Sequence, residues 1–103
     1  MPVAMTMANV SAAFEAAGGD RKRNWDKLSE RGKEAYVRRL QEKGHEPEEL
    51  SVLLRKGDAA QKWAAVHWLV RAEFCASVNE ARTGFMRRRR AAAALRHAPR
   101  EEV

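Results

Sequence analysis

The chain has 103 residues, of which 45% are hydrophobic and 33% are charged, and it carries a formal net charge of +6. This length suits one small domain, and the abundance of Ala, Leu, Glu, Lys and Arg excludes a mainly β fold in favour of an all-α one. A single cysteine excludes an intrachain disulfide, and no apolar run is long enough to span a membrane, so we expect a cytoplasmic protein.

The N-terminal residues predict a flexible start followed by a short helix. Residues 1–8 contain no helix cap and no apolar periodicity, so we expect them to be flexible. Asn9 is of a type that often caps helices, and the Gly-Gly pair that follows residue 17 is typical of a helix end. A helix is therefore predicted over residues 9–17, as the first element of a helical domain over residues 9–84.

The second predicted helix covers residues 25–43. Asn24 or Asp26 can cap its N-terminus, and Gly44 is expected to end it. Apolar or small residues recur along it at a spacing of three and four, which is typical of a helix with one buried face. The members of that face are Trp25, Leu28, Gly32, Ala35, Tyr36 and Leu40.

Two further helices are predicted over residues 47–56 and 58–83. Pro47 suits the first position of a helix, and Gly57 suits the position just after its end. Asp58 then caps the next helix, so the two helices meet at a tight junction. With the helices before them they make a small four-helix domain that contains one long, central, apolar helix.

The long helix over residues 58–83 is apolar on two sides, which charged residues such as Arg71 and Glu73 separate. One interpretation is that the other three helices wrap around it. The other is that one face belongs to the core of the monomer and the second face binds another chain, most simply a second copy. We favour the homodimer, because the other helices carry few large apolar side chains. The candidate partner or dimer interface comprises Tyr36, Leu40, Trp63, Trp68, Leu69, Ala72, Phe74, Cys75 and Ala76.

Residues 85–103 form a basic C-terminal segment. They hold six Lys/Arg and two Asp/Glu, whereas the residues before them hold 14 and 12. Four consecutive arginines precede a run of alanines, which predicts a helix with little ability to form a core, ended by Pro99. The segment is interpreted either as the solvated end of the chain or as an arm that contacts a polyanion. Consecutive arginines lie around a helix rather than along one side of it, which favours loose attraction over the reading of bases.

The sequence carries no pattern typical of an active site. The histidines, His45, His67 and His97, are not at metal-ligand spacing, and Cys75 has no second cysteine near it. The sequence also lacks a glycine-rich phosphate loop and a nucleophile motif. We therefore expect a protein that is not an enzyme and that binds no metal or cofactor.

Two functions remain, and both are forms of binding. The favoured one is a small regulatory protein, for example an inhibitor or antiactivator that binds and masks a transcription factor or another protein. The Ala- and Arg-rich composition suggests a bacterial source. The alternative is a DNA-binding regulator that uses the basic tail and the junction between the third and fourth predicted helices, although a recognition helix needs a more polar outer face than this one has. The polyanion contacts of the alternative are Lys62, Arg71, Arg87, Arg88, Arg89 and Arg90.

Overall fold

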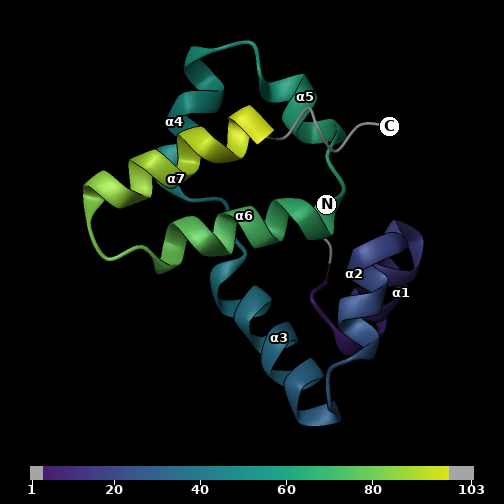
Figure 1. Ribbon diagram of the computed structural model, residues 1–103. Helices are drawn as coiled ribbons and strands as arrows, with labels where there is room; N and C mark the ends of the chain where they lie inside the picture. The colour runs from purple at the N-terminus through teal and green to yellow at the C-terminus, as the bar shows by residue number, and fades with distance from the viewer. Residues whose placement is uncertain (1–3, 98–103) are drawn as a thin grey trace.

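The computed structural model describes residues 4–97, and this range contains helices and no strand (Figure 1). The all-α prediction is therefore confirmed for the described residues. The helices of this range are α1 (Met7–Ala17), α2 (Gly19–Asp26), α3 (Glu30–Lys43), α4 (Glu48–Lys56), α5 (Ala60–Ala65), α6 (Trp68–Glu80) and α7 (Gly84–His97). The prediction of four main helices is not confirmed: α2 lies mostly before the second predicted helix, the fourth predicted helix is divided into α5 and α6, and α7 lies in the C-terminal segment.

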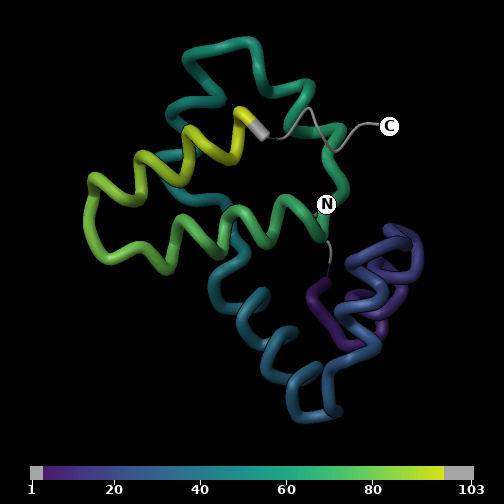
Figure 2. Tube along the Cα trace, viewed as in Figure 1, coloured from purple at the N-terminus to yellow at the C-terminus, as the bar shows by residue number. Residues whose placement is uncertain are grey.

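Helix α6 crosses the middle of the molecule, and the other helices lie on two sides of it (Figure 2). On one side α6 packs against α3, and α1 packs beside both α2 and α3. On the other side the chain turns at residues 81–83 and returns as α7, which packs against both α6 and α4. The chain therefore supplies its own cover for the two sides of α6.

Helix α1 begins earlier than predicted because Thr6, and not Asn9, is its N-cap. The hydroxyl oxygen of Thr6 accepts a hydrogen bond from the backbone N–H of Asn9, at 3.2 Å. Residues 7 and 8, which the sequence placed before the first helix, are therefore helical, while residues 1–3 lie outside the described residues. Gly18 follows the end of α1 as predicted, with a backbone φ of 63° that glycine adopts more easily than other residues.

A turn divides the helix that the sequence predicted over residues 25–43. Trp25 lies near the end of α2, and α3 begins after Ser29, whose hydroxyl oxygen accepts a backbone N–H of the first turn at 3.1 Å. Asn24 and Asp26, the caps that the sequence suggested, therefore do not cap α3. The turn allows the ring of Trp25 to stack on Phe14, with ring centroids 5.0 Å apart. Packing of two large rings outweighs the small preference of these residues for a continuous helix.

The long apolar helix predicted over residues 58–83 is also interrupted. Helix α5 ends before Val66, whose backbone is extended, and α6 begins after His67. The Nδ1 atom of His67 accepts a hydrogen bond from the backbone N–H of Leu69, at 3.1 Å, and so caps α6. The break turns α5 away from the axis of α6, and Trp63 of α5 packs into the core beside α4 and α7.

Two apolar cores lie on opposite sides of α6. The N-terminal core consists of Val10, Ala13, Phe14, Trp25, Val37, Leu40, Leu69 and Ala72, with Met5, Met7, Tyr36 and Trp68 at its edge. The C-terminal core consists of Leu50, Trp63, Val66, Val70, Cys75, Val78, Ala91 and Ala94, with Leu53, Leu54, Phe74 and Leu95 at its edge. Because α6 contributes side chains to both cores, each of its apolar faces is covered by the chain itself.

The residues that the sequence suggested as a partner or dimer interface lie in or beside these cores. Six are buried, namely Leu40, Trp63, Leu69, Ala72, Cys75 and Ala76. Three are half-buried, namely Tyr36, Trp68 and Phe74. One face of α6 was expected to be open, whereas in the described fold both of its faces pack against other helices of the chain. A homodimer stays a prediction, and of the suggested interface residues only Tyr36, Trp68 and Phe74 keep part of their surface exposed in the folded chain.

Candidate functional site

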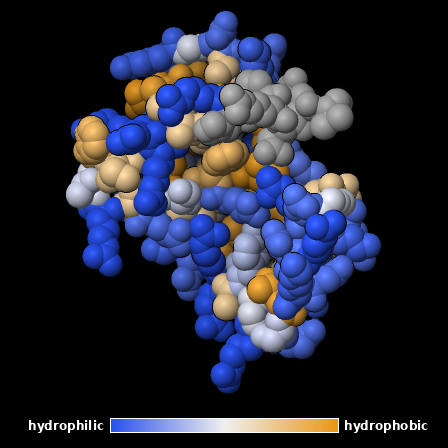
Figure 3. Space-filling model, viewed as in Figure 1, coloured by the Kyte–Doolittle hydropathy of each residue, from blue (hydrophilic) through white to orange (hydrophobic). Residues whose placement is uncertain are grey.

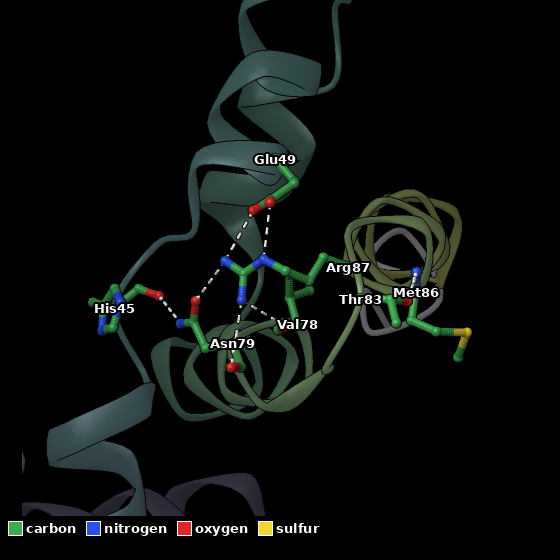
Figure 4. Close-up of polar contacts among 7 residues, drawn as sticks. All are labelled: His45, Glu49, Val78, Asn79, Thr83, Met86 and Arg87. Atoms are coloured by element: carbon green, nitrogen blue, oxygen red, sulfur yellow. Dashed lines mark hydrogen bonds and ion pairs between the residues drawn. The ribbon is translucent and has the colours of Figure 1, made fainter.

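Arg87, which the sequence suggested as a polyanion contact, is engaged within the fold (Figure 4). Its guanidinium donates two hydrogen bonds to the carboxylate of Glu49 on α4, at 2.8 and 3.0 Å. It also donates to the carbonyl oxygen of Val78 near the end of α6, at 3.3 Å. The neighbouring Asn79 donates to the carbonyl oxygen of His45, at 2.9 Å. These contacts join α4, α6, α7 and the turn that precedes α4.

The pair formed by Arg87 and Glu49 is charge-assisted and specific in geometry. Hydrogen bonds from Arg87 hold the pKa of Glu49 below its ordinary value, and the same bonds raise the pKa of Arg87. Both side chains are largely covered, with 27% and 24% of their surfaces exposed. Arg87 therefore has a structural role in this fold, and it would have to leave Glu49 before it could contact a phosphate.

The four arginines of α7 divide into an inner and an outer pair. Arg87 and Arg90 point toward α6, and Arg90 donates a hydrogen bond to the carbonyl oxygen of Ser77 at 2.7 Å. Arg88 and Arg89 are exposed. The sequence argument that consecutive arginines lie around the helix is therefore correct in geometry, but only the outer pair is open to a partner.

Helix α7 is not a solvated tail over its described length. Ala91 and Ala94 are 0% exposed and belong to the C-terminal core. Their small side chains let α7 approach α6 closely, so the alanine run forms core where we expected little ability to do so. Residues 98–103, including the predicted helix end at Pro99, lie outside the described residues.

An open cavity of about 320 Å³ lies between α4 and α7. We call it the α4–α7 groove, and the residues that line it are Glu48, Glu49, Val52, Leu53, Lys56, Arg88 and Ala92. Its floor is apolar and its rim is charged. Figure 3 shows apolar side chains gathered over α4, with hydrophilic side chains around them. This combination is typical of a surface that binds an apolar group and orients it by charge.

The groove exists because the helix that faces α4 presents a small residue there. Val52 and Leu53 of α4 are half-buried, and Ala92 of α7 is exposed. An alanine side chain is too short to reach across and cover them. The larger neighbour on α7 is Arg88, one turn earlier, which also lines the groove and whose guanidinium lies beside Gly84. Part of the apolar surface of α4 therefore remains accessible.

The other suggested polyanion contacts, Lys62 and Arg71, lie on α5 and α6 and not on α7. Lys62 is exposed on α5, whereas Arg71 lies half-buried on α6. The Nε atom of Arg71 is buried and has no hydrogen-bond partner among the described residues. The exposed arginines on or next to α7 are Arg82, Arg88, Arg89 and Arg96.

A second cavity, of about 380 Å³, lies between α2, α3 and α6, and its charged groups are already paired. Glu73 at its wall accepts hydrogen bonds from the hydroxyl of Tyr36 and from Arg21, the latter at 3.0 Å. Burial and the bond to Glu73 raise the pKa of the Tyr36 hydroxyl. Arg39 is paired with Glu80 through two bonds of 2.9 Å. These contacts join α2, α3 and α6, so we interpret this cavity as part of the packing between helices and not as a binding site.

Cys75, suggested as an interface residue, is buried in the C-terminal core. Burial raises the pKa of its thiol to about 11, so the thiol is protonated at neutral pH and is a poor nucleophile. Within residues 4–97, no group of three or more His, Cys, Asp or Glu side chains is arranged to hold a metal ion.

Comparison with protein families, with curated proteins and with solved structures gives no match for this chain. Among the helices of the described range, none has both the length and the apolar character needed to cross a membrane.

The groove was not predicted from the sequence, although the sequence carries a signal for it. Four apolar residues, Leu50, Val52, Leu53 and Leu54, crowd into a helix of nine residues. Such a set covers more than one side of a short helix, so a single neighbour cannot bury all of it. Leu50 is fully buried and the other three are only half-buried. The signal indicates a surplus apolar face on α4, in addition to the one that we noted on the long helix.

Proposed function

We propose that this protein is a small regulatory protein, not an enzyme, that binds another protein in the α4–α7 groove and so masks a surface of that partner. An example of such a protein is an inhibitor or antiactivator that binds a transcription factor in the cytoplasm of a bacterium. The observation that carries the proposal is the accessible apolar floor of the groove, formed by Val52, Leu53 and Ala92.

The floor favours protein over nucleic acid as the occupant. Full burial of a Val or Leu side chain is worth about 1.5–3 kcal/mol, which an apolar side chain of a partner can recover and a phosphate cannot. The groove also lies on a fixed scaffold, because Arg87 ties α7 to Glu49 on α4. A surface that is already in place loses little entropy when a partner binds.

The test uses Val52→Gln, which replaces a floor residue by a polar one that is also compatible with a helix. Val52 is not among the residues packed against either core, so we expect the fold to survive. Tagged wild type and variant are used to co-purify partners, which mass spectrometry identifies. The purified partner is then titrated against both proteins. We expect the variant to keep its helical circular dichroism and to lose most of its affinity.

The matched control is Leu28→Gln. Leu28 is 37% exposed in the turn between α2 and α3, away from the groove. The Leu28→Gln variant also replaces an accessible apolar side chain by a polar one. It therefore tests whether the loss of any exposed apolar side chain weakens binding. Equal binding by Val52→Gln and wild type would remove the groove from the proposal.

Nucleic-acid binding is the second candidate, and the exposed arginines Arg82, Arg88 and Arg89 favour it. Each phosphate contact on duplex DNA adds about 0.9 to the slope of log affinity against log salt. A titration of random duplex DNA at several salt concentrations measures that slope. A slope near three that falls in Arg88→Gln and Arg89→Gln, with no effect of Val52→Gln, would favour this candidate over protein binding.

A further inference from the structure

Two acidic and two basic residues line the α4–α7 groove, and each of the two acids is also paired with an arginine outside the lining. The two acidic residues that line it are paired, Glu49 with Arg87 at 2.8 Å and Glu48 with Arg55 at 3.4 Å. The two basic lining residues, Lys56 and Arg88, form no ion pair with other residues of the described range. An excess of positive charge therefore stands beside an apolar floor.

The positive charge continues along the exposed side of α7. Arg89 follows Arg88 directly, and Arg96 lies about two turns further along. Both side chains are exposed. Between them lies Ala92, whose small side chain leaves the groove accessible. The accessible surface is thus an apolar strip with cations along one edge and at one end.

We propose that the occupant of the α4–α7 groove is an acidic amphipathic helix of another protein. This inference rests on the proposed function and names its partner by chemistry. The apolar side of such a helix packs on Val52, Leu53 and Ala92, and its carboxylates lie near Lys56 and Arg88. Binding of an amphipathic helix in a groove between helices is a common mode of recognition. A volume of about 320 Å³ holds a few side chains and is small for a whole cofactor.

Charge argues against two other occupants. A second copy placed groove to groove would bring Arg88 and Lys56 of one chain against the same residues of its partner, and like charges at an interface oppose association. A nucleic acid would satisfy the cations but would leave the apolar floor without a matching surface. An acidic amphipathic helix satisfies both the cations and the floor.

The experiment measures two labelled peptides by fluorescence anisotropy. Both peptides have about 16 residues, enough for roughly four helical turns. The first has leucines on one face and glutamates on the flanking positions, and the second has lysines in place of the glutamates. We expect the acidic peptide to bind wild type about tenfold more tightly than the basic one at low salt, because rim charges discriminate by sign.

Three variants locate the interaction. Arg88→Glu should weaken the acidic peptide and strengthen the basic one, because it reverses the sign of a rim charge. Arg31→Glu is the matched control, since it changes the net charge equally at an exposed position of α3. Val52→Gln should weaken both peptides, because both need the floor. Circular dichroism and a thermal melt verify that each variant is folded.

Each other outcome overturns the inference. Equal affinity for the two peptides, or no binding of the acidic one, means that the groove does not select acidic helices. Loss of binding in Arg31→Glu equal to that in Arg88→Glu, or no effect of Val52→Gln, means attraction to net charge alone. If duplex DNA displaces the acidic peptide, the groove binds nucleic acid. If light scattering gives the mass of a dimer, and Val52→Gln abolishes that dimer, the groove binds a second copy. A natural partner that is lost in Val52→Gln but indifferent to Arg88→Glu leaves the proposed function standing and rejects only the acidic helix.

Discussion

The two cores on either side of α6 are built from different kinds of side chain. In the N-terminal core, Phe14, Trp25 and Tyr36 form a cluster of rings with centroids 5.0 to 6.3 Å apart. In the C-terminal core, α7 meets α6 through the fully buried Ala91 and Ala94. Rings fill the space between helices that stand apart, whereas alanines allow two helices to approach closely.

This difference bears on the α4–α7 groove, which lies on the C-terminal side. The ring cluster reaches across from α1 and α2 to α3 and covers the space between them. Alanine brings α7 close to α6, but Ala92 on the outer side of α7 does not reach the apolar residues of α4. Polar contacts, mainly those of Arg87, hold α4 and α7 together beneath the groove. Large rings therefore fill most of the N-terminal core, whereas on the C-terminal side part of the apolar surface of α4 stays accessible beside Ala92.

The largest expected effect is the loss of a ring from the N-terminal core. Trp25 is 4% exposed and stacks on Phe14, so Trp25→Ala should cost about 3–5 kcal/mol of unfolding free energy. Urea denaturation followed by circular dichroism measures it. The control, Leu28→Ala, removes a 37% exposed side chain and should cost less than about 1 kcal/mol. Similar losses in the two variants would mean that the ring cluster is not the main support of this half.

A smaller effect distinguishes two adjacent alanines of α7. Ala91 is 0% exposed, so Ala91→Leu should overpack the C-terminal core and cost about 1–3 kcal/mol. Ala92 is exposed and lines the groove, so Ala92→Leu should change stability by less than about 0.5 kcal/mol. The added side chain of Ala92→Leu should also fill the groove and weaken the acidic peptide. A destabilised Ala92→Leu, or an unaffected Ala91→Leu, would contradict the assigned faces of α7.

The smallest effect depends on pH and concerns the contact between Arg87 and Glu49. Because Arg87 lowers the pKa of Glu49 in the folded state, the pair contributes stability above about pH 4.3, the ordinary pKa of Glu in an unfolded chain. That contribution is lost as the pH falls through the lower folded pKa. Arg87→Met should therefore lower the thermal midpoint at pH 7 more than at about pH 3.

Arg89→Met is the control for this comparison, because Arg89 is exposed on the same helix. It should leave the midpoint almost unchanged at both values of pH. A decrease in Arg87→Met that is the same at both values of pH would indicate that the lost packing, and not the ion pair, accounts for it.

Much of the local structure could be predicted from the sequence. The all-α class follows from composition, and the ends of helices at Gly18, Gly44 and Gly57 follow from the identity of single residues. The break at His67 could not be predicted from the sequence. His67 caps α6 at a point where the chain turns, and Trp63 just before this turn packs into the C-terminal core. Helix stops and caps act over a few residues, so a sequence pattern indicates them; a break caused by packing depends on residues far along the chain.

The candidate site shows the same division more sharply. The sequence by itself determined that α7 carries four arginines on all sides and that the chain has more apolar surface than a simple core requires. Only the tertiary structure decided that Arg87 and Arg90 turn inward, that Leu69 is buried within its own chain, and that part of the apolar surface of α4 stays accessible at Val52. The physical reason is that a residue type sets what a side chain can contact, whereas the path of the chain sets which partner comes within reach.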